Sequence, residues 1–289
     1  MAVEPGVLYV VATPIGNLDD ITLRALQVLR EVDLVAAEDT RHSRCLLQHF
    51  GIHTPLVSLH EHNEHSRIPQ LLTQLQQGKA IALISDAGTP LISDPGFHLL
   101  RSLRERGLRA VPVPGPSSLL AALSVAGMPT DRFVFEGFLP PKSAARRNRL
   151  AMLAQDERTL VLFEASHRLP ASLSDMATVL GENRQAVLAR ELTKLFEEIH
   201  GATLAELCDW ITAEENRCKG EFVIIVQGAT QPVTTSSNPE VRRLLAALLE
   251  DLPVKHAVAV AARLTDVKKN ALYDLALNIK SGSTPSKDV

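Results

Sequence analysis

Short runs of Val, Leu, Ile and Ala recur through the first part of the chain, and each is followed by a segment with helical spacing of its apolar side chains. The runs predict strands at residues 7–12, 32–37, 80–84 and 109–113. The segments between them predict a helix that begins after Asp20 as N-cap, and helices at 66–77, 97–106 and 117–126. Alternation of strand and helix favours a parallel sheet with helices on both faces. Aromatic residues make up only 4% of the chain, so the core must be aliphatic, which suits buried parallel strands.

A second α/β set begins after a break at residues 127–131. Strands are predicted at 133–138, 159–163, 186–189 and 221–227, with helices at 169–180 and 204–213; residues 196–200 are also strand-like, which indicates antiparallel edges. Residues 229–239 have the composition of a linker. Helical patterns follow at 241–249, 254–264 and 268–279, and the last two resemble a helix-turn-helix pair. The predicted organisation is two α/β domains at 1–127 and 128–228, a linker at 229–239 and a small helical unit at 240–289.

Charge and cysteine usage narrow the class of protein. The net charge is −3, so a surface for nucleic acid has to be a local patch. Cys45, Cys208 and Cys218 form no CxxC pair and are odd in number, which argues against a disulfide framework or a thiolate zinc site. The sequence shows no cationic N-terminal leader and no apolar run of about eighteen residues. We therefore expect a cytoplasmic protein without a membrane span.

Three loops of unusual composition follow predicted strands. The first, residues 13–17, contains one glycine, whereas a dinucleotide fingerprint needs three, so Glu38 and Asp39 about twenty residues further on do not indicate an NAD site. The others are residues 85–90, followed by a second turn at 94–96, and residues 112–118. The carboxyl ends of parallel strands share one edge of a sheet. Three such loops on one edge predict a ligand crevice rather than simple turns.

Seven short motifs in these and later loops carry a resemblance to a known family. Thr-Pro-Ile-Gly-Asn at 13–17, Glu-Asp-Thr-Arg-His at 38–42, Ser-Asp-Ala-Gly-Thr-Pro at 85–90 and Pro-Gly-Pro-Ser-Ser at 114–118 resemble the tetrapyrrole methylase superfamily, the class III methyltransferases. Phe-Glu-Ala-Ser-His-Arg at 163–168, Ala-Arg-Glu-Leu-Thr-Lys at 189–194 and Lys-Gly-Glu-Phe-Val at 219–223 are similar to bacterial methyltransferases that act on the ribose 2′-hydroxyl of a 16S rRNA cytidine. The resemblance extends from about residue 7 to residue 273. One departure from the family's motifs is Ala165, where proline or threonine is more usual. A small residue at this position is expected to change the site little.

The resemblance implies a fold, a cofactor and a substrate. It implies two α/β domains of the tetrapyrrole methylase type with S-adenosylmethionine in the cleft between them, usually in a homodimer, and a decoding-centre cytidine of the small ribosomal subunit as substrate. It also implies the cofactor-binding residues: Pro14, Ile15 and Gly16 on the floor; Asp86, Ala87, Gly88, Thr89, Ser117 and Ser118 around the methionine and ribose; and Phe163, Ala189, Leu192, Gly220, Glu221 and Phe222 over the adenine.

Charged side chains at the ends of two strands are the catalytic candidates. Salt bridges in the interior would be the ordinary explanation, but charges at strand ends that face one crevice fit catalysis better. A ribose hydroxyl is a poor nucleophile and benefits from a base and a nearby cation. We expect Glu164 or His167 to remove the proton, and Lys194 or Arg190 to stabilise the developing alkoxide.

Two basic segments are candidates for RNA contact. Lys142, Arg146, Arg147 and Arg149 form a run without acids, which is either a solvated helix face or a loop that grips phosphates. In the last two predicted helices and the turn between them, residues 254–280, five cations, Lys268 and Lys269 among them, outnumber two acids. That excess favours RNA contact, although the apolar positions there are equally consistent with a dimer interface.

Six of the ten histidines lie between His42 and His65, which raises the possibility of a metal site. An HxHxxH pattern in a loop does not fix ligand geometry, and methyl transfer from a sulfonium needs no metal, so we expect a solvated loop and no metal. Two other functions stay open: a tetrapyrrole methyltransferase, and a non-catalytic RNA-binding assembly factor. The first leaves the basic segments without a purpose, and the second does not need the loops at 85–90 and 114–118.

Overall fold

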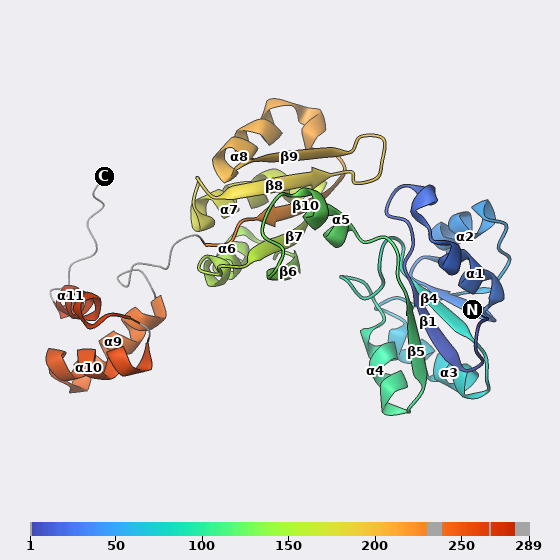
Figure 1. Cartoon of the computed structure of the whole chain (residues 1–289), viewed down its shortest axis with the longest axis horizontal. Coiled ribbons are helices and arrows are strands. Elements are labelled where there is room, and N and C mark those ends of the chain that lie inside the picture. Colours follow the sequence, from blue (N-terminus) through green and yellow to red (C-terminus); the bar gives the residue numbers. More distant parts are fainter. Residues whose placement is uncertain (1, 230–238, 266, 281–289) are drawn as a thin grey trace. The chain divides into compact units, whose positions relative to one another are not determined.

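The computed structural model describes residues 2–229, 239–265 and 267–280 (Figure 1). By their contacts the residues divide into two units, one up to Gly228 and one from Ala229 onward. Residues 230–238 of the predicted linker and 281–289 of the predicted helical unit lie outside the described residues. The predicted boundary at 127/128 stays a prediction.

The first sheet is parallel throughout, as predicted. Its strand order is β3-β2-β4-β1-β5, with β1 at Val7–Val11, β2 at Leu34–Ala37, β3 at Leu56–Ser58, β4 at Ile81–Ile84 and β5 at Arg109–Val113. Helices α1 (Leu23–Glu31) and α2 (Thr40–His49) pack on one face, and α3 (Glu64–Gln76) and α4 (Phe97–Glu105) on the other. Because successive strand residues point to opposite faces, Val7, Tyr9 and Val11 of β1 contact α1 while Leu8 contacts the α3 side.

Two details of this half differ from the sequence-based expectation. The cap of α1 is Thr22, whose hydroxyl accepts the Ala25 N–H at 3.0 Å, while Asp20 ends a 3-10 turn at Leu18–Asp20. The elements α2 and β3 were not predicted. Helix α2 is mostly polar and buries only Ser43 and Leu47, so it offers few apolar residues from which a helix can be recognised.

The second sheet is mixed, in the order β6-β7-β10-β8-β9. Its strands are β6 (Phe133–Phe138), β7 (Thr159–Ala165), β8 (Gln185–Arg190), β9 (Glu198–Thr203) and β10 (Glu221–Val226). The antiparallel pairing is not confined to the edge, because the central strand β10 is antiparallel to both β7 and β8. On one face lie α6 (Ser143–Leu153), which was not predicted, α7 (Leu169–Leu180) and α8 (Leu204–Ala213).

The other face of the second sheet is covered from the first part of the chain. Helix α5 (Ser118–Val125) and Ile15, from the loop after β1, pack on Val161, Val223 and Ile225 in one buried cluster. This cluster ties the loops at the carboxyl edge of the first sheet to the second sheet.

The C-terminal unit consists of α9 (Pro239–Asp251), α10 (Val254–Leu264) and α11 (Lys269–Lys280). The three helices share a separate core in which Leu245, Ala257, Ala261 and Leu272 are fully buried. The predicted helical unit, including the α10–α11 pair, is confirmed for the described residues.

Candidate functional site

The three predicted loops lie side by side because β4, β1 and β5 are neighbours in the sheet. Thr13 and Gly88 exchange backbone hydrogen bonds of 2.9 and 3.0 Å, which join the first loop to the second. The Thr89 hydroxyl donates to the Pro116 carbonyl at 3.0 Å and joins the second loop to the third. The loops therefore form one connected rim at the carboxyl edge of the sheet.

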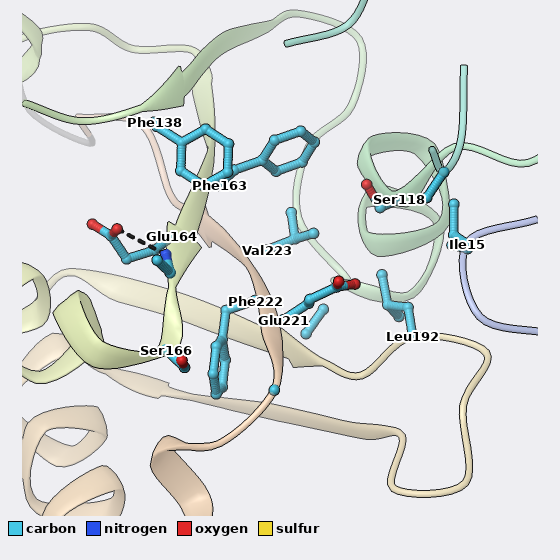
Figure 2. A pocket seen from close by; sticks show the side chains of 14 residues that line it. Ile15, Ser118, Phe138, Phe163, Glu164, Ser166, Leu192, Glu221, Phe222 and Val223 are labelled. Atoms are coloured by element: carbon cyan, nitrogen blue, oxygen red, sulfur yellow. Dashed lines mark hydrogen bonds between the residues drawn. The ribbon is translucent and has the colours of Figure 1, made fainter. Parts of the chain in front are cut away.

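Three adjoining cavities open where this rim meets the second sheet. The aromatic cavity, of about 380 Å³, is lined by Phe138, Phe163 and Phe222 among others (Figure 2). The loop cavity, of about 230 Å³, lies over Gly88, Thr89 and Ser117. The α2 cavity, of about 380 Å³, lies between the first loop, α2 and Lys194. Ala87 and Glu221 border all three cavities.

The residues predicted to bind the cofactor all border these cavities. Pro14, Gly16 and Asp86 line the α2 cavity, and Gly88, Thr89 and Ser117 line the loop cavity. The aromatic cavity is lined by the other nine: Ile15, Ala87, Ser118, Phe163, Ala189, Leu192, Gly220, Glu221 and Phe222. The sequence motifs thus identified one contiguous site. The use of its parts for the cofactor stays a prediction.

The aromatic cavity is apolar and well supported. The Phe163 ring packs edge-to-face on Phe135 and Phe138, with ring centroids 5.0 and 5.7 Å apart, so its position is fixed from two sides. Serine and threonine side chains of the loop cavity lie at the other end of this hollow. An apolar slot beside a cluster of hydroxyl and backbone groups fits a ligand with an aromatic base and a polar, charged end.

Lys194 lines the α2 cavity, and its ammonium group is bound by two carboxylates. Its Nζ donates to Glu191 Oε1 and to Glu221 Oε2, both at 2.9 Å. Burial would lower the pKa of Lys194, but these hydrogen bonds outweigh it and raise the pKa above its ordinary value, so the ammonium stays charged. Burial would likewise raise the pKa of Glu191, and the hydrogen bond from Lys194 with that from the Glu221 N–H lowers it instead.

The backbone around Lys194 is strained to hold it there. Glu191 and Thr193 have φ of 50° and 67°, in the left-handed region that residues with a Cβ rarely adopt. Gly16 is required on the facing loop, because a Cβ there would lie 2.4 Å from Lys194 Cγ. Gly220 has φ of 109°, and a Cβ would lie 2.6 Å from Glu191 Cγ. Lys194 and both glycines are predicted site residues, whereas the role of Glu191 was not predicted.

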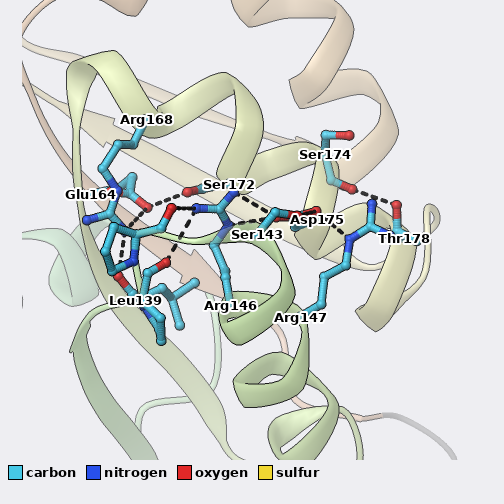
Figure 3. A network of polar contacts seen from close by, with 12 residues as sticks. Leu139, Ser143, Arg146, Arg147, Glu164, Arg168, Ser172, Ser174, Asp175 and Thr178 are labelled. Atoms are coloured by element: carbon cyan, nitrogen blue, oxygen red, sulfur yellow. Dashed lines mark hydrogen bonds and ion pairs between the residues drawn. The ribbon is translucent and has the colours of Figure 1, made fainter.

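Glu164 is not placed to act as the base, which corrects one of the two predictions for proton removal. The residue borders the aromatic cavity, but its carboxylate points away from it toward α7 (Figure 2). There it accepts hydrogen bonds from the Ser172 hydroxyl and the Ala165 N–H, and Arg168 Nε lies 3.2 Å from it (Figure 3). A buried carboxylate with these partners serves the packing of β7 on α7.

The other two catalytic candidates also lie apart from the cavities. His167 is exposed in the 3-10 turn Ser166–Arg168. Arg190 donates to the carbonyls of Asn216 and Lys219, each at 2.8 Å, and so holds the segment that leads into Gly220. Of the four candidates, Lys194 is the one that lines a cavity with its charged group engaged there.

Carboxylates gather at the carboxyl edge of the first sheet. Burial, together with Asp86 and Asp94, raises the pKa of Glu38, and burial raises that of Asp94. Asp39 instead caps α2, where its Oδ1 accepts the Arg41 N–H at 2.8 Å. In the described part of the chain no group of three or more His, Cys, Asp or Glu is arranged to hold a metal ion. The absence of a metal from the reaction stays a prediction.

The basic run is not a uniform loop. Arg146 is only 3% exposed; its guanidinium pairs with Asp175 at 2.7 Å and donates to the Pro140 and Pro141 carbonyls (Figure 3). Its predicted contact with phosphate is therefore corrected to a structural role. Lys142 and Arg147 are exposed on α6 or at its start, and Arg149 is half-buried beside Glu136. Lys268 and Lys269 are exposed at the start of α11.

Comparisons with known proteins show the family to which the chain belongs. A model described as "Tetrapyrrole (Corrin/Porphyrin) Methylases" matches residues 7–208, and one described as the RsmI C-terminal HTH domain matches residues 235–280. Ribosomal RNA small subunit methyltransferase I of Pseudomonas aeruginosa is 58% identical over 94% of this chain and 97% of its own length. The chain belongs to the tetrapyrrole methylase family. The protein of the same name from Escherichia coli O157:H7 is 56% identical over 94% of this chain and 95% of its own.

Solved structures of the family share the fold. A cobalt precorrin-4 methyltransferase matches with a TM-score of 0.55 and 18% identity over 77% of this chain and 95% of its own. A uroporphyrin-III C-methyltransferase of Thermus thermophilus matches with a TM-score of 0.53 and 20% identity over 77% and 94%. Within the described residues, no helix is both long and apolar enough to cross a bilayer.

Proposed function

We propose that this member of the family transfers a methyl group from S-adenosylmethionine to the ribose 2′-hydroxyl of a decoding-centre cytidine in the 16S rRNA of the small ribosomal subunit. The observation that carries the proposal is the high identity, over nearly the whole chain, to proteins named ribosomal RNA small subunit methyltransferase I. A cytoplasmic homodimer belongs to the same proposal.

The cavities fit the proposed cofactor. Phe163, Phe222 and Leu192 offer an apolar slot to the adenine, and the hydroxyls of Thr89, Ser117 and Ser118 lie where a ribose and an amino acid would need partners. When bound, the cofactor supplies a methyl group that its sulfonium has already activated. The chain has to align the acceptor oxygen with it and exclude water.

Lys194 and Glu221 supply the charges next to the acceptor. The ammonium of Lys194, held between two carboxylates, stabilises the negative charge that develops on the ribose oxygen. Glu221 borders all three cavities, and its Oε2 accepts a hydrogen bond from Lys194 Nζ; we assign this carboxylate to accept the proton that leaves the hydroxyl as the oxygen–carbon bond forms. Glu221 thereby takes the role first expected of Glu164 or His167.

A strain that lacks this chain tests the proposal. Ribose 2′-methylation protects the neighbouring phosphodiester from alkaline hydrolysis, so 16S rRNA is mapped for protected positions with and without the protein. We expect one protected cytidine to disappear and to return with the wild-type chain. An unchanged map refutes the proposal, and methyl transfer by the purified protein to a tetrapyrrole would favour the other function considered above.

RNA contact is assigned to Lys142, Arg147 and Arg149 on α6 and to Lys268 and Lys269 on the C-terminal unit. Alanine at the three α6 positions is expected to weaken binding to small subunits and to flatten its salt dependence by about 0.7–0.9 in log–log slope per lost phosphate contact. Filter binding at several salt concentrations measures both.

The matched control removes three exposed arginines from α4 and its end, Arg101, Arg104 and Arg106, none of which borders the aromatic, loop or α2 cavity. That variant should bind RNA as wild type does. If the α6 variant keeps its affinity and its slope, these residues form only a solvated face.

A further inference from the structure

One face of α2 forms the outer wall of the α2 cavity. His42, Cys45, Leu46 and His49 follow the spacing i, i+3, i+4, i+7, and all four line the cavity, while the opposite face buries Ser43 and Leu47. We propose that this cavity binds the target ribonucleotide of the RNA, turned out of its stack, and that the α2 face is the wall against which its base lies. The inference rests on the proposed function and names where its substrate binds.

The α2 cavity is largely separate from the space that suits the cofactor, and the proposal reassigns to the substrate Pro14, Gly16 and Asp86, which line it and were first expected to bind the cofactor. The aromatic and loop cavities share Ser118, Phe138 and Phe163 and together offer both the apolar slot and the hydroxyl cluster. The α2 cavity shares with the aromatic one only Ile15, Ala87 and Glu221. A ligand in the α2 cavity therefore meets a ligand in the aromatic cavity at one end, which is the arrangement that transfer between two bound molecules requires.

The position of Lys194 supports this division. Its side chain lines the α2 cavity but not the aromatic one, so the cation that stabilises the acceptor oxygen faces the α2 cavity. Lys194 and Glu221 lie at the shared end, where a sugar hydroxyl would have to be. The imidazoles and Leu46 lie on the α2 side, where a base would have to be.

The size and chemistry of the cavity fit a nucleoside. Its volume of about 380 Å³ lies within the usual range for small-molecule sites, about 300–1,000 Å³. Enzymes that modify a nucleotide inside a folded RNA turn it out and hold its base against aromatic and apolar side chains. His42 and His49 offer ring faces and ring nitrogens for that purpose, and Leu18 and Leu46 offer apolar surface.

The charge of α2 also fits an RNA strand. Residues 40–49 contain two arginines and two histidines but no acid. Arg41 and Arg44 are both exposed, one turn or less from the cavity wall. Arg41 also pairs with Asp39 at 3.2 Å, and Arg44 is the other exposed cation of α2 that can meet a phosphate beside an extruded nucleotide.

Filling the cavity tests the inference. Cys45 is exposed on the wall, and Cys45→Trp places a large ring in the cavity, whereas Gln48→Trp places the same ring on the same helix outside that face. We expect Cys45→Trp to keep the wild-type Kd for S-adenosylmethionine in calorimetry and to lose methyl transfer to small subunits about 100-fold or more. Gln48→Trp should resemble wild type in both measurements.

A second measurement needs no turnover. With Cys208 and Cys218 changed to serine, alkylation of Cys45 by N-ethylmaleimide should slow at least several-fold when unmodified small subunits are added, and S-adenosylhomocysteine alone should not slow it. If Cys45→Trp binds S-adenosylmethionine more weakly, the α2 cavity belongs to the cofactor and the inference is overturned. Full methyl transfer by Cys45→Trp also overturns it. A wild-type protein inactive on small subunits refutes the proposed function itself, a result that these variants do not produce.

Discussion

Replacing Lys194 with alanine is expected to lower kcat for methylation of small subunits by about 100- to 1,000-fold, while the Kd for S-adenosylmethionine stays near wild type. The ammonium is held by Glu191 and Glu221 at the edge of the α2 cavity, outside the lining of the aromatic cavity. Under the proposed function it acts on the acceptor oxygen rather than on the cofactor. Single-turnover transfer of a labelled methyl group measures the chemical step, and calorimetry measures cofactor binding.

Two other substitutions separate a catalytic role from a general loss of charge. Lys219→Ala removes an exposed lysine beside the same turn, whose Nζ donates to Asn216, and should leave kcat near wild type. Gly16→Ala keeps Lys194 but puts a Cβ 2.4 Å from its Cγ, so the ammonium must move and kcat should fall. An unchanged kcat in Lys194→Ala would contradict the assignment.

The helix that sequence predicted best is one with many apolar residues and a cap that can be recognised in the sequence. Helix α8 begins and ends at the expected residues, and its capping box is readable in sequence as Thr203 followed by Glu206. Helix α2 contains few apolar residues and buries only Ser43 and Leu47, and its N-cap Asp39 had been considered only as a ribose ligand. Because α2 was not predicted, the wall of the α2 cavity could not be predicted either.

The sequence motifs predicted which residues border the site. They did not predict the direction in which each charged side chain points. Phe163 and Glu164 are neighbours on β7, and successive side chains of a strand point to opposite faces. Alternation alone does not exclude Glu164, because Phe222, its partner on β10, faces the same side of the sheet and still lines the cavity. The hydrogen bond from Ser172 and the ion pair with Arg168 decide the direction of its carboxylate. Sequence does not locate Arg146 either, because its partner Asp175 is distant in sequence and on another helix.

Removal of the Asp175 carboxylate is expected to be the most damaging change to stability in the second α/β set. Asp175 is 5% exposed at its side chain, and it accepts hydrogen bonds from Ser143, Arg146 and Arg147, which fasten α6 to α7 (Figure 3). Asp175→Ala leaves the buried guanidinium of Arg146 without its counter-ion. We expect a loss of about 3–5 kcal/mol in the free energy of unfolding, measured by denaturant titration.

The same network predicts how stability depends on pH. Burial would raise the pKa of Asp175, but the hydrogen bonds from Arg147, Ser143 and Arg146 outweigh it, so the folded-state pKa lies below its ordinary value of about 3.9. The stabilisation is therefore complete above about pH 4–5 and is lost as the pH falls through the lower folded-state pKa. In Asp175→Asn the corresponding loss on acidification should be absent, because no proton is taken up at that position.

An exposed pair provides the scale against which the Asp175 result is judged. Arg101 and Glu105 form an i,i+4 pair on α4 with side chains 66% and 62% exposed, so Glu105→Ala should cost less than about 1 kcal/mol. If Asp175→Ala costs no more than that, Arg146 is not held by its counter-ion, and its assignment to structure instead of RNA loses its basis.

Arg146→Met combined with Asp175→Leu should be less harmful than Asp175→Ala alone, because the double change removes both buried charges and leaves neither unpaired. Since Lys142 and Arg147 lie at the start and on the outer face of the helix that this network fastens, RNA binding by the folded Asp175→Asn variant should weaken along with its stability.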